Sequence, residues 1–173
     1  DAAAVRNCNL DATRIVGGIY NSTAYDVVTN NQNLAILDSI TFTGTGRIDA
    51  SSASGTVTFA GTVPQYIPAN SIRNDLVTKL TINNPAGVTL GNALTVSTLL
   101  TLTGGKFNVS GNTLTLNGTN TLGTTANLNT TSSSSLVFGG SSSGVIIPSG
   151  VSNLNNLTIN NSNGITLGSS PVV

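Results

Sequence analysis

Residues 80–118 decide the fold, and they read LTINNPAGVTLGNALTVSTLLTLTGGKFNVSGNTLTLNG. Three-residue segments, each with a polar residue between two apolar ones, alternate here with short runs of Asn, Gly, Pro and Ser. Alternation with period two puts both apolar side chains of a segment on one face of a β-strand, and the intervening residues favour tight turns. The stretch therefore predicts very short strands and excludes a helix. The apolar residues of these segments are Leu80, Ile82, Val88, Leu90, Leu94, Val96, Leu100, Leu102, Phe107, Val109, Leu114 and Leu116.

The spacing of the segments predicts how the strands stack. Leu100 follows Leu80 by 20 residues, and Leu114 follows Leu94 by 20. Continuing the series places Leu122 over Leu100, at a separation of 22 residues. We therefore predict an all-β protein, a right-handed parallel β-helix (β-solenoid) with roughly three short strands per coil of about 20 residues. Its Thr side chains are expected to point outward, and its aliphatic side chains to fill the bore.

An internal repeat supports an array of coils. Residues 80–91 (LTINNPAGVTLG) recur as residues 157–168 (LTINNSNGITLG), at an offset of 77 residues. The offset corresponds to four coils of about 19 residues, which need twelve strands, but only eleven can be counted. Either a strand is hidden in residues 131–144 or one coil has only two sides. In the second copy, the residues expected to fill the bore are Leu157, Ile159, Ile165 and Leu167.

The chain is expected to have two parts. Residues 1–35 lack the regular rhythm and are assigned to an N-terminal cap or attachment segment, because an open solenoid end exposes its bore and unpaired strand edges. Residues 36–173 are assigned to solenoid repeats that continue beyond the last residue or pair with another subunit. Residues 62–79 contain two Pro and several charges, which suggests a projecting loop. That loop is the first candidate for a specific contact surface, the alternative being a merely solvated connection.

The composition restricts the function classes. Charged residues make up 7% of the 173 residues, and the formal net charge is zero, so no basic stripe is present for nucleic acid. No apolar run is long enough to predict a membrane span. Ser, Thr and Asn must provide the solubility, as in extracellular fibres. We therefore expect a secreted, cell-surface protein.

Catalytic and metal-binding chemistry has little support. The chain has no His and only six acidic residues, and the one group that could approach near one coil is Asp38, Arg47 and Asp49. Paired surface charges are usually structural, so we predict no enzyme, no cofactor and no metal site. Runs such as Asn83–Asn84 and Asn160–Asn161 are expected to form hydrogen-bonded ladders at the corners.

Two further features leave alternatives open. Cys8 is the single cysteine, so it is either a small buried hydrophobe or the site of an intermolecular disulfide. Thr-x-Thr pairs occur at residues 56–58, 101–103 and 113–115. If the coils aligned them they would form flat hydroxyl and methyl arrays like those of ice-binding solenoids, but we expect them to scatter over different faces.

From about residue 55 to residue 173 the sequence resembles the β-strand repeat surface proteins of Bacteroidota. The resemblance rests on LTINNxxGVTLG, followed by LTV, LTLTGG and NTLTLNG. Members of that family are long secreted chains, often adhesin-like and exported by the type IX route; the family's C-terminal sorting domain is not found in this sequence. The resemblance implies an extracellular fibre or adhesin, or a passive stalk that displays a distal binding domain. It implies as partners neighbouring repeats or further copies, with cell-surface carbohydrate as another candidate, and no catalytic residues.

Overall fold

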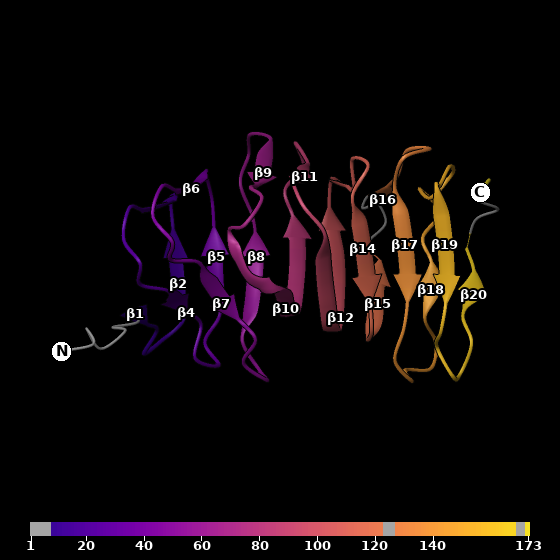
Figure 1. Cartoon of the computed structure of the whole chain (residues 1–173), viewed down its shortest axis with the longest axis horizontal. Helices are drawn as coiled ribbons and strands as arrows, with labels where there is room; N and C mark the ends of the chain where they lie inside the picture. The colour runs from indigo at the N-terminus through magenta and orange to yellow at the C-terminus, as the bar shows by residue number, and fades with distance from the viewer. Residues whose placement is uncertain (1–7, 123–126, 169–171) are drawn as a thin grey trace.

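The computed structural model describes residues 8–122, 127–168 and 172–173. The described residues form short β-strands joined by turns, and they contain no α-helix. All strand pairs are parallel, and the coils stack side by side along the long axis from β1 to β20 (Figure 1). The predicted β-solenoid is therefore confirmed. No helix in the described residues is long and apolar enough to cross a membrane.

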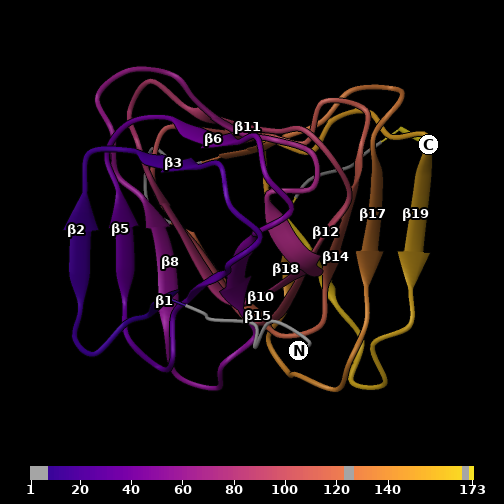
Figure 2. The same ribbon diagram turned by 60° about the vertical axis from the view of Figure 1, so that its left-hand side comes forward.

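Three faces can be followed around each coil. Face 1 comprises β1 (Cys8–Asn9), β4 (Val27–Val28), β7 (Ile48–Ala50), the first halves of β10 (Ile72–Asn83) and β12 (Leu94–Gly104), β14 (Thr113–Leu116), β17 (Ser135–Phe138) and β19 (Asn156–Ile159). Face 2 comprises β2 (Arg14–Val16), β5 (Leu34–Ile36), β8 (Thr56–Phe59), the second halves of β10 and β12, and β15 (Thr119–Leu122). Face 3 comprises β3 (Ile19–Asn21), β6 (Ile40–Phe42), β9 (Gln65–Ile67), β11 (Val88–Leu90), β13 (Lys106–Asn108) and β16 (Asn127–Asn129). In Figure 2, β2, β5 and β8 stand side by side while β3 and β6 cross above them.

Face 2 continues through β18 (Ile146–Ile147) and β20 (Thr166–Leu167), which pair with each other. Between β15 and β18 a side chain replaces the backbone ladder. The Asn120 amide nitrogen donates to the Ile146 carbonyl at 2.6 Å, and its oxygen accepts from the Ile146 N–H at 3.1 Å. A carboxamide presents the same donor and acceptor as a peptide group, so the coil-to-coil contact is kept where strand pairing stops.

The strand register bears out the stacking expected from the sequence. Leu80 pairs with Leu100, and Leu94 pairs with Leu114. The expectation for Leu122 is wrong, because Leu122 lies over Leu102 and the residue over Leu100 is Asn120. The strand begins at Thr119, and because Asn120 is polar, the apolar–polar alternation did not reveal that start.

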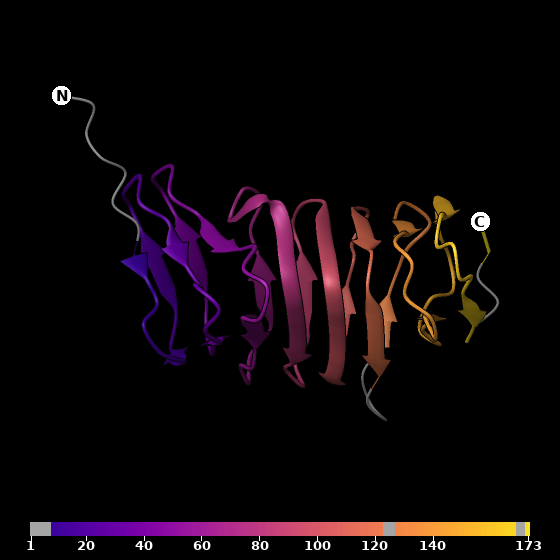
Figure 3. The same cartoon turned by 90° about the horizontal axis from the view of Figure 1, so that it is seen from below.

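Strands β10 and β12 are much longer than the expected three residues. They span 12 and 11 residues and bend from face 1 into face 2. In β12, Ser97 and Thr98 separate the two expected segments, and neither residue stops a strand as Gly or Pro would. The bend takes the form of register shifts, one of them between Val77 and Lys79. Figure 3 shows both strands running across the rod.

The internal repeat turns out to be rotated around the rod. Leu80 lies on face 2, where it pairs with Leu100, whereas Leu157 lies on face 1, where it pairs with Leu136. Eleven strands at three strands per coil make three full coils and two-thirds of a fourth. The second copy therefore starts on a different face from the first. Ten strand segments run from the second half of β10 to β18, and the isolated bridge at Asn153 occupies the eleventh position. Both explanations offered for a missing twelfth strand are therefore wrong. Residues 131–144 contain β17 and no further strand.

The bore is filled as expected in the middle coils and opens at the last one. The twelve apolar residues of the 80–118 stretch are each at most 3% exposed. In the second copy, Leu157 and Ile165 are half-buried. Ile159 and Leu167 pair with the buried residues Phe138 and Ile147 but are themselves 48% and 63% exposed. They belong to the last described coil, and no further described coil covers them.

Two segments expected to be irregular are part of the coil stack. Residues 8–35 contain β1 to β4, which pair in parallel with strands of the next coil, and β5 runs across the expected boundary at residue 35. Polar residues at strand ends, such as Arg14 and Asn21, hid the rhythm there. Residues 62–79 do not form a projecting loop, because they contain β9 and most of β10.

Candidate contact surface

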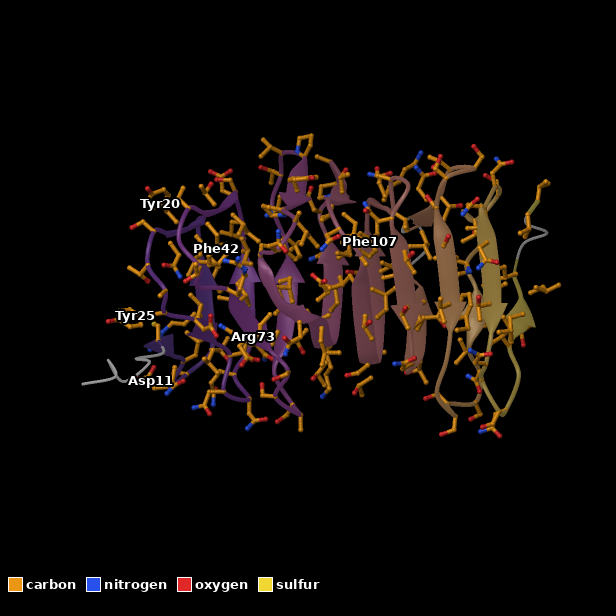
Figure 4. The ribbon with its side chains drawn as sticks, viewed as in Figure 1. Asp11, Tyr20, Tyr25, Phe42, Arg73 and Phe107 are labelled. Atoms are coloured by element: carbon orange, nitrogen blue, oxygen red, sulfur yellow. The ribbon has the colours of Figure 1, made fainter. Side chains whose placement is uncertain are left out.

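Charged side chains gather at the corner where face 3 meets face 1, near the N-terminal end. Asp26 directly precedes β4, Arg47 directly precedes β7, and Arg73 and Asp75 lie in β10. Because β4, β7 and β10 pair in parallel, these residues come from three successive coils. Figure 4 shows Arg73 between the N-terminal end of the rod and Phe107 near its middle. We call Asp26, Arg47, Asp49, Arg73 and Asp75 the charged corner.

A buried carboxylate holds this corner together. Asp26 is 4% exposed. It forms an ion pair with the Nε of Arg73, and its Oδ1 accepts a hydrogen bond from the Arg47 backbone N–H at 2.8 Å. Burial raises the pKa of the Asp26 carboxyl, but the ion pair with Arg73, the hydrogen bond from the Arg47 backbone and the positive charges of both side chains outweigh it, so that the pKa lies below its usual value. Asp26 therefore stays ionised and fixes Arg73 in place.

A wide bulge in β10 opens a hollow beside this ion pair. Ile72 pairs with Ile48 and Val77 with Ala50. The four residues 73–76 of β10 therefore lie opposite a single residue of β7, Asp49. The bulge contains Asn74 and Asp75, whose φ angles are 55° and 51°. The hollow has a volume of about 320 Å³ and is lined by Thr45, Arg47, Asn70, Ile72, Arg73, Asn74 and Asp75.

Hydrogen bonds to neighbouring residues hold two polar side chains of the hollow, Asp75 and Arg47, in place. The amide of Asn92, one coil further on, donates to both carboxylate oxygens of Asp75 at 3.3 and 3.4 Å. The guanidinium of Arg47 donates to the carbonyls of Gly44 and Gly46 at 3.2 and 2.7 Å. Position 46 requires glycine, because a Cβ there would lie 2.1 Å from the Tyr25 carbonyl oxygen. The corner is therefore a fixed arrangement of donors and acceptors.

The candidate cluster of Asp38, Arg47 and Asp49 does not assemble. Arg47 and Asp49 both lie at the charged corner, but the Asp49 carboxylate accepts from Ser51. Asp38 lies between β5 and β6, at the corner of faces 2 and 3. Among the described residues there is no group of three His, Cys, Asp or Glu that could hold a metal ion. Sequence reasoning missed Asp26, whose only signal was that it precedes a Val-Val pair one coil before Arg47.

The asparagine runs behave differently from the expected ladders. Asn84 is fully buried and donates to the Val63 carbonyl at 2.7 Å and to the Gln65 side-chain oxygen at 2.9 Å. Its equivalent in the second copy, Asn161, donates to the Ser142 carbonyl at 2.9 Å. Both side chains therefore tie a corner to the preceding coil. A stacked amide pair does occur on face 3, where Asn129 donates to Asn108 at 2.9 Å.

Threonines pair in register along face 2, and the side chains of Thr58, Thr81 and Thr101 are partly exposed on its outer side. Thr58 pairs with Thr81, Thr81 with Thr101, and Thr101 with Thr121. The neighbouring column is mixed, because Lys79 lies between Thr56 and Leu99. The Thr-x-Thr pairs themselves are divided between faces, with residues 56–58 and 101–103 on face 2 and residues 113–115 on face 1.

Cys8 is exposed in β1, where its backbone pairs with Val27. The expectation that it is a small buried hydrophobe is therefore wrong. The alternative, an intermolecular disulfide, stays a prediction.

Comparisons with protein-family models, with curated proteins and with solved structures found no match. The candidate surface therefore has to be judged from its own geometry.

Proposed function

We propose that this chain is a structural segment of an extracellular surface fibre or adhesin. The observation that carries the proposal is the single core of buried apolar side chains that extends along the rod. The few ionisable residues and the polar Ser, Thr and Asn surface support an exported protein. The sequence resemblance to β-strand repeat surface proteins supports the same function.

The energetics of the coils favour an extended role. An apolar side chain of the bore is removed from water only when neighbouring coils cover it, whereas every residue of the coil loses conformational entropy when it is ordered. A coil with few buried residues cannot offset that cost without neighbours on both sides. Stability therefore increases with the number of stacked coils, which suits a stalk or fibre.

The test is to locate the native protein and image it. An antibody raised against this chain should label the surface of intact producing cells, with permeabilised cells as the control. Negative-stain electron microscopy of the released material should show rods or filaments. Filaments with a regular axial repeat would indicate a polymerising fibre, and isolated rods a passive stalk with a distal domain. Labelling that requires permeabilisation would overturn the proposal.

A second candidate function is ice binding, which the threonine column of face 2 favours. Hydroxyl and methyl groups repeated at the strand spacing of about 4.8 Å form a regular array. Purified protein would be assayed for thermal hysteresis and ice-crystal shaping. Activity lost in Thr101→Tyr on face 2 and kept in Thr115→Tyr on face 1 would support this function, and the absence of thermal hysteresis would eliminate it.

A further inference from the structure

We infer that the hollow at the charged corner binds a neutral saccharide. The inference rests on the proposed surface function; it narrows the candidate carbohydrate partner to neutral sugars and assigns it a site. The hollow is lined by two Arg, two Asn, one Asp and one Thr around a single aliphatic side chain, that of Ile72. Its volume of about 320 Å³ falls at the lower end of small-molecule pockets, about 300–1,000 Å³. This size suits a short sugar unit.

Two Arg and three Asp lie in and beneath the hollow, so their charges nearly compensate one another. Arg73 is paired with the buried Asp26 and also feels the negative charge of Asp49. Asp75 supplies a further carboxylate to the lining, which also contains the positively charged Arg47. A strongly charged ligand would therefore gain little net attraction. An uncharged ligand with many hydroxyl groups can use both the donors and the acceptors.

The kinds of side chain match sugar hydroxyls. A carboxylate accepts hydrogen bonds through two oxygens, a guanidinium donates through a planar fork, and a carboxamide does both. Neighbouring hydroxyls of a sugar ring can each donate and accept, so they complement such planar groups in pairs. Asp75 is the one carboxylate in the lining, and the Asn92 amide donates to both of its oxygens.

The backbone at this corner adopts an unusual conformation. Six described non-glycine residues have positive φ, and three of them, Asn70, Asn74 and Asp75, line this hollow. Such conformations cost energy and tend to collect at binding sites, where the surrounding structure holds them. Elsewhere the strands run without this wide bulge, so the bulge is a local feature of the hollow and not a requirement of the solenoid.

The experiment uses the whole chain and an array of immobilised neutral, uronate-bearing and sialylated oligosaccharides. We expect binding to neutral oligosaccharides. Asp75→Asn should weaken that binding at least about tenfold, because it replaces a charge-assisted acceptor by a neutral amide. Asp11→Asn is the matched control, since Asp11 is an exposed carboxylate at the N-terminal end, away from the hollow (Figure 4). Circular dichroism should show that both variants melt like the parent protein.

Several results would overturn the inference. Equal binding by Asp75→Asn and the parent protein would place the sugar site elsewhere. Binding to acidic oligosaccharides alone, lost in Arg47→Gln, would replace the neutral ligand by an anionic one. Absence of binding to every oligosaccharide would remove the site. The proposed surface function has its own test, the antibody labelling of intact cells. A negative result in that test can therefore be distinguished from a failure of the sugar site.

Discussion

The two copies of the internal repeat share most of their sequence but differ in burial. In the first copy, Ile82 is fully buried and Leu90 is 2% exposed. In the second, the equivalent Ile159 and Leu167 are 48% and 63% exposed. The first copy has a coil on each side, whereas the second lies in the last described coils. Burial in this fold is therefore conferred by neighbouring coils, and the sequence of one coil does not determine it.

The largest expected difference between the copies comes from truncating a bore side chain. Ile82→Ala should lower the free energy of unfolding by about 2–5 kcal/mol, because it leaves a cavity in a closed stack. Ile159→Ala should cost about 1 kcal/mol or less, since its side chain already contacts solvent. Urea unfolding followed by circular dichroism measures both. Equal losses would mean that the second copy is as enclosed as the first.

A smaller difference is expected for the buried asparagines. Asn84→Ala should cost about 1–3 kcal/mol, because it leaves the Gln65 side-chain oxygen and the Val63 carbonyl short of a donor in a buried corner. Asn161→Ala removes a corresponding hydrogen bond, to Ser142, in a more open coil. Its cost should be at the lower end of the same range. A greater loss for Asn161→Ala in the same urea assay would contradict the view that enclosure sets the cost.

The pH dependence should distinguish the regions that hold the two copies. The folded pKa of Asp26 is lowered, so its contribution to stability is present above the unfolded value of about 3.9. That contribution is lost as the pH falls through the lower, folded value. No charged side chain follows Lys106, so the acid sensitivity should be confined to the N-terminal half.

The acid sensitivity of each region can be measured by hydrogen exchange with mass spectrometry from about pH 5 to about pH 2. The rates are corrected for intrinsic exchange. Residues 27–50 should lose protection before residues 127–168 do. The Asp26→Asn variant should show a weaker dependence on pH over this range. Simultaneous loss of protection in both regions of the parent protein would indicate that the charged corner does not govern the acid response.

The smallest effect is expected on the outer surface. Thr101→Ser removes one outward methyl group and should change the free energy of unfolding by less than about 0.5 kcal/mol. Leu102→Ala, at the adjacent inward position, should cost about 2–5 kcal/mol. The pair sharpens the distinction between bore and surface. Similar losses at both positions would contradict the assignment of inward and outward faces.

The sequence predicted the parallel stack well, because period-two alternation and a constant coil length both survive in regular coils. It failed where polar residues occupy strand positions, as at Asn120, and where no turn residue separates two faces, as in β12. It also could not reveal the rotation of the repeat, since similar segments fit any of the three faces.

The charged corner was only partly predictable. Arg47, Arg73 and Asp75 were visible as scattered charges, but no pattern of residues indicated that a wide bulge in β10 would bring them to one hollow. Asp26 acquires its importance through burial by coils that are distant in sequence. Contacts of this kind depend on exact coil lengths, and a difference of one residue would move a side chain to another position.

The central claim is that successive coils lie directly over one another. In a Cys8→Ser background, spin labels at positions 81 and 101 should lie on adjacent strands of face 2, about 4.8 Å apart at the backbone. Strong dipolar broadening of the electron paramagnetic resonance spectrum is the predicted result. A spectrum without dipolar broadening, from protein whose circular dichroism matches that of the parent, would contradict the account.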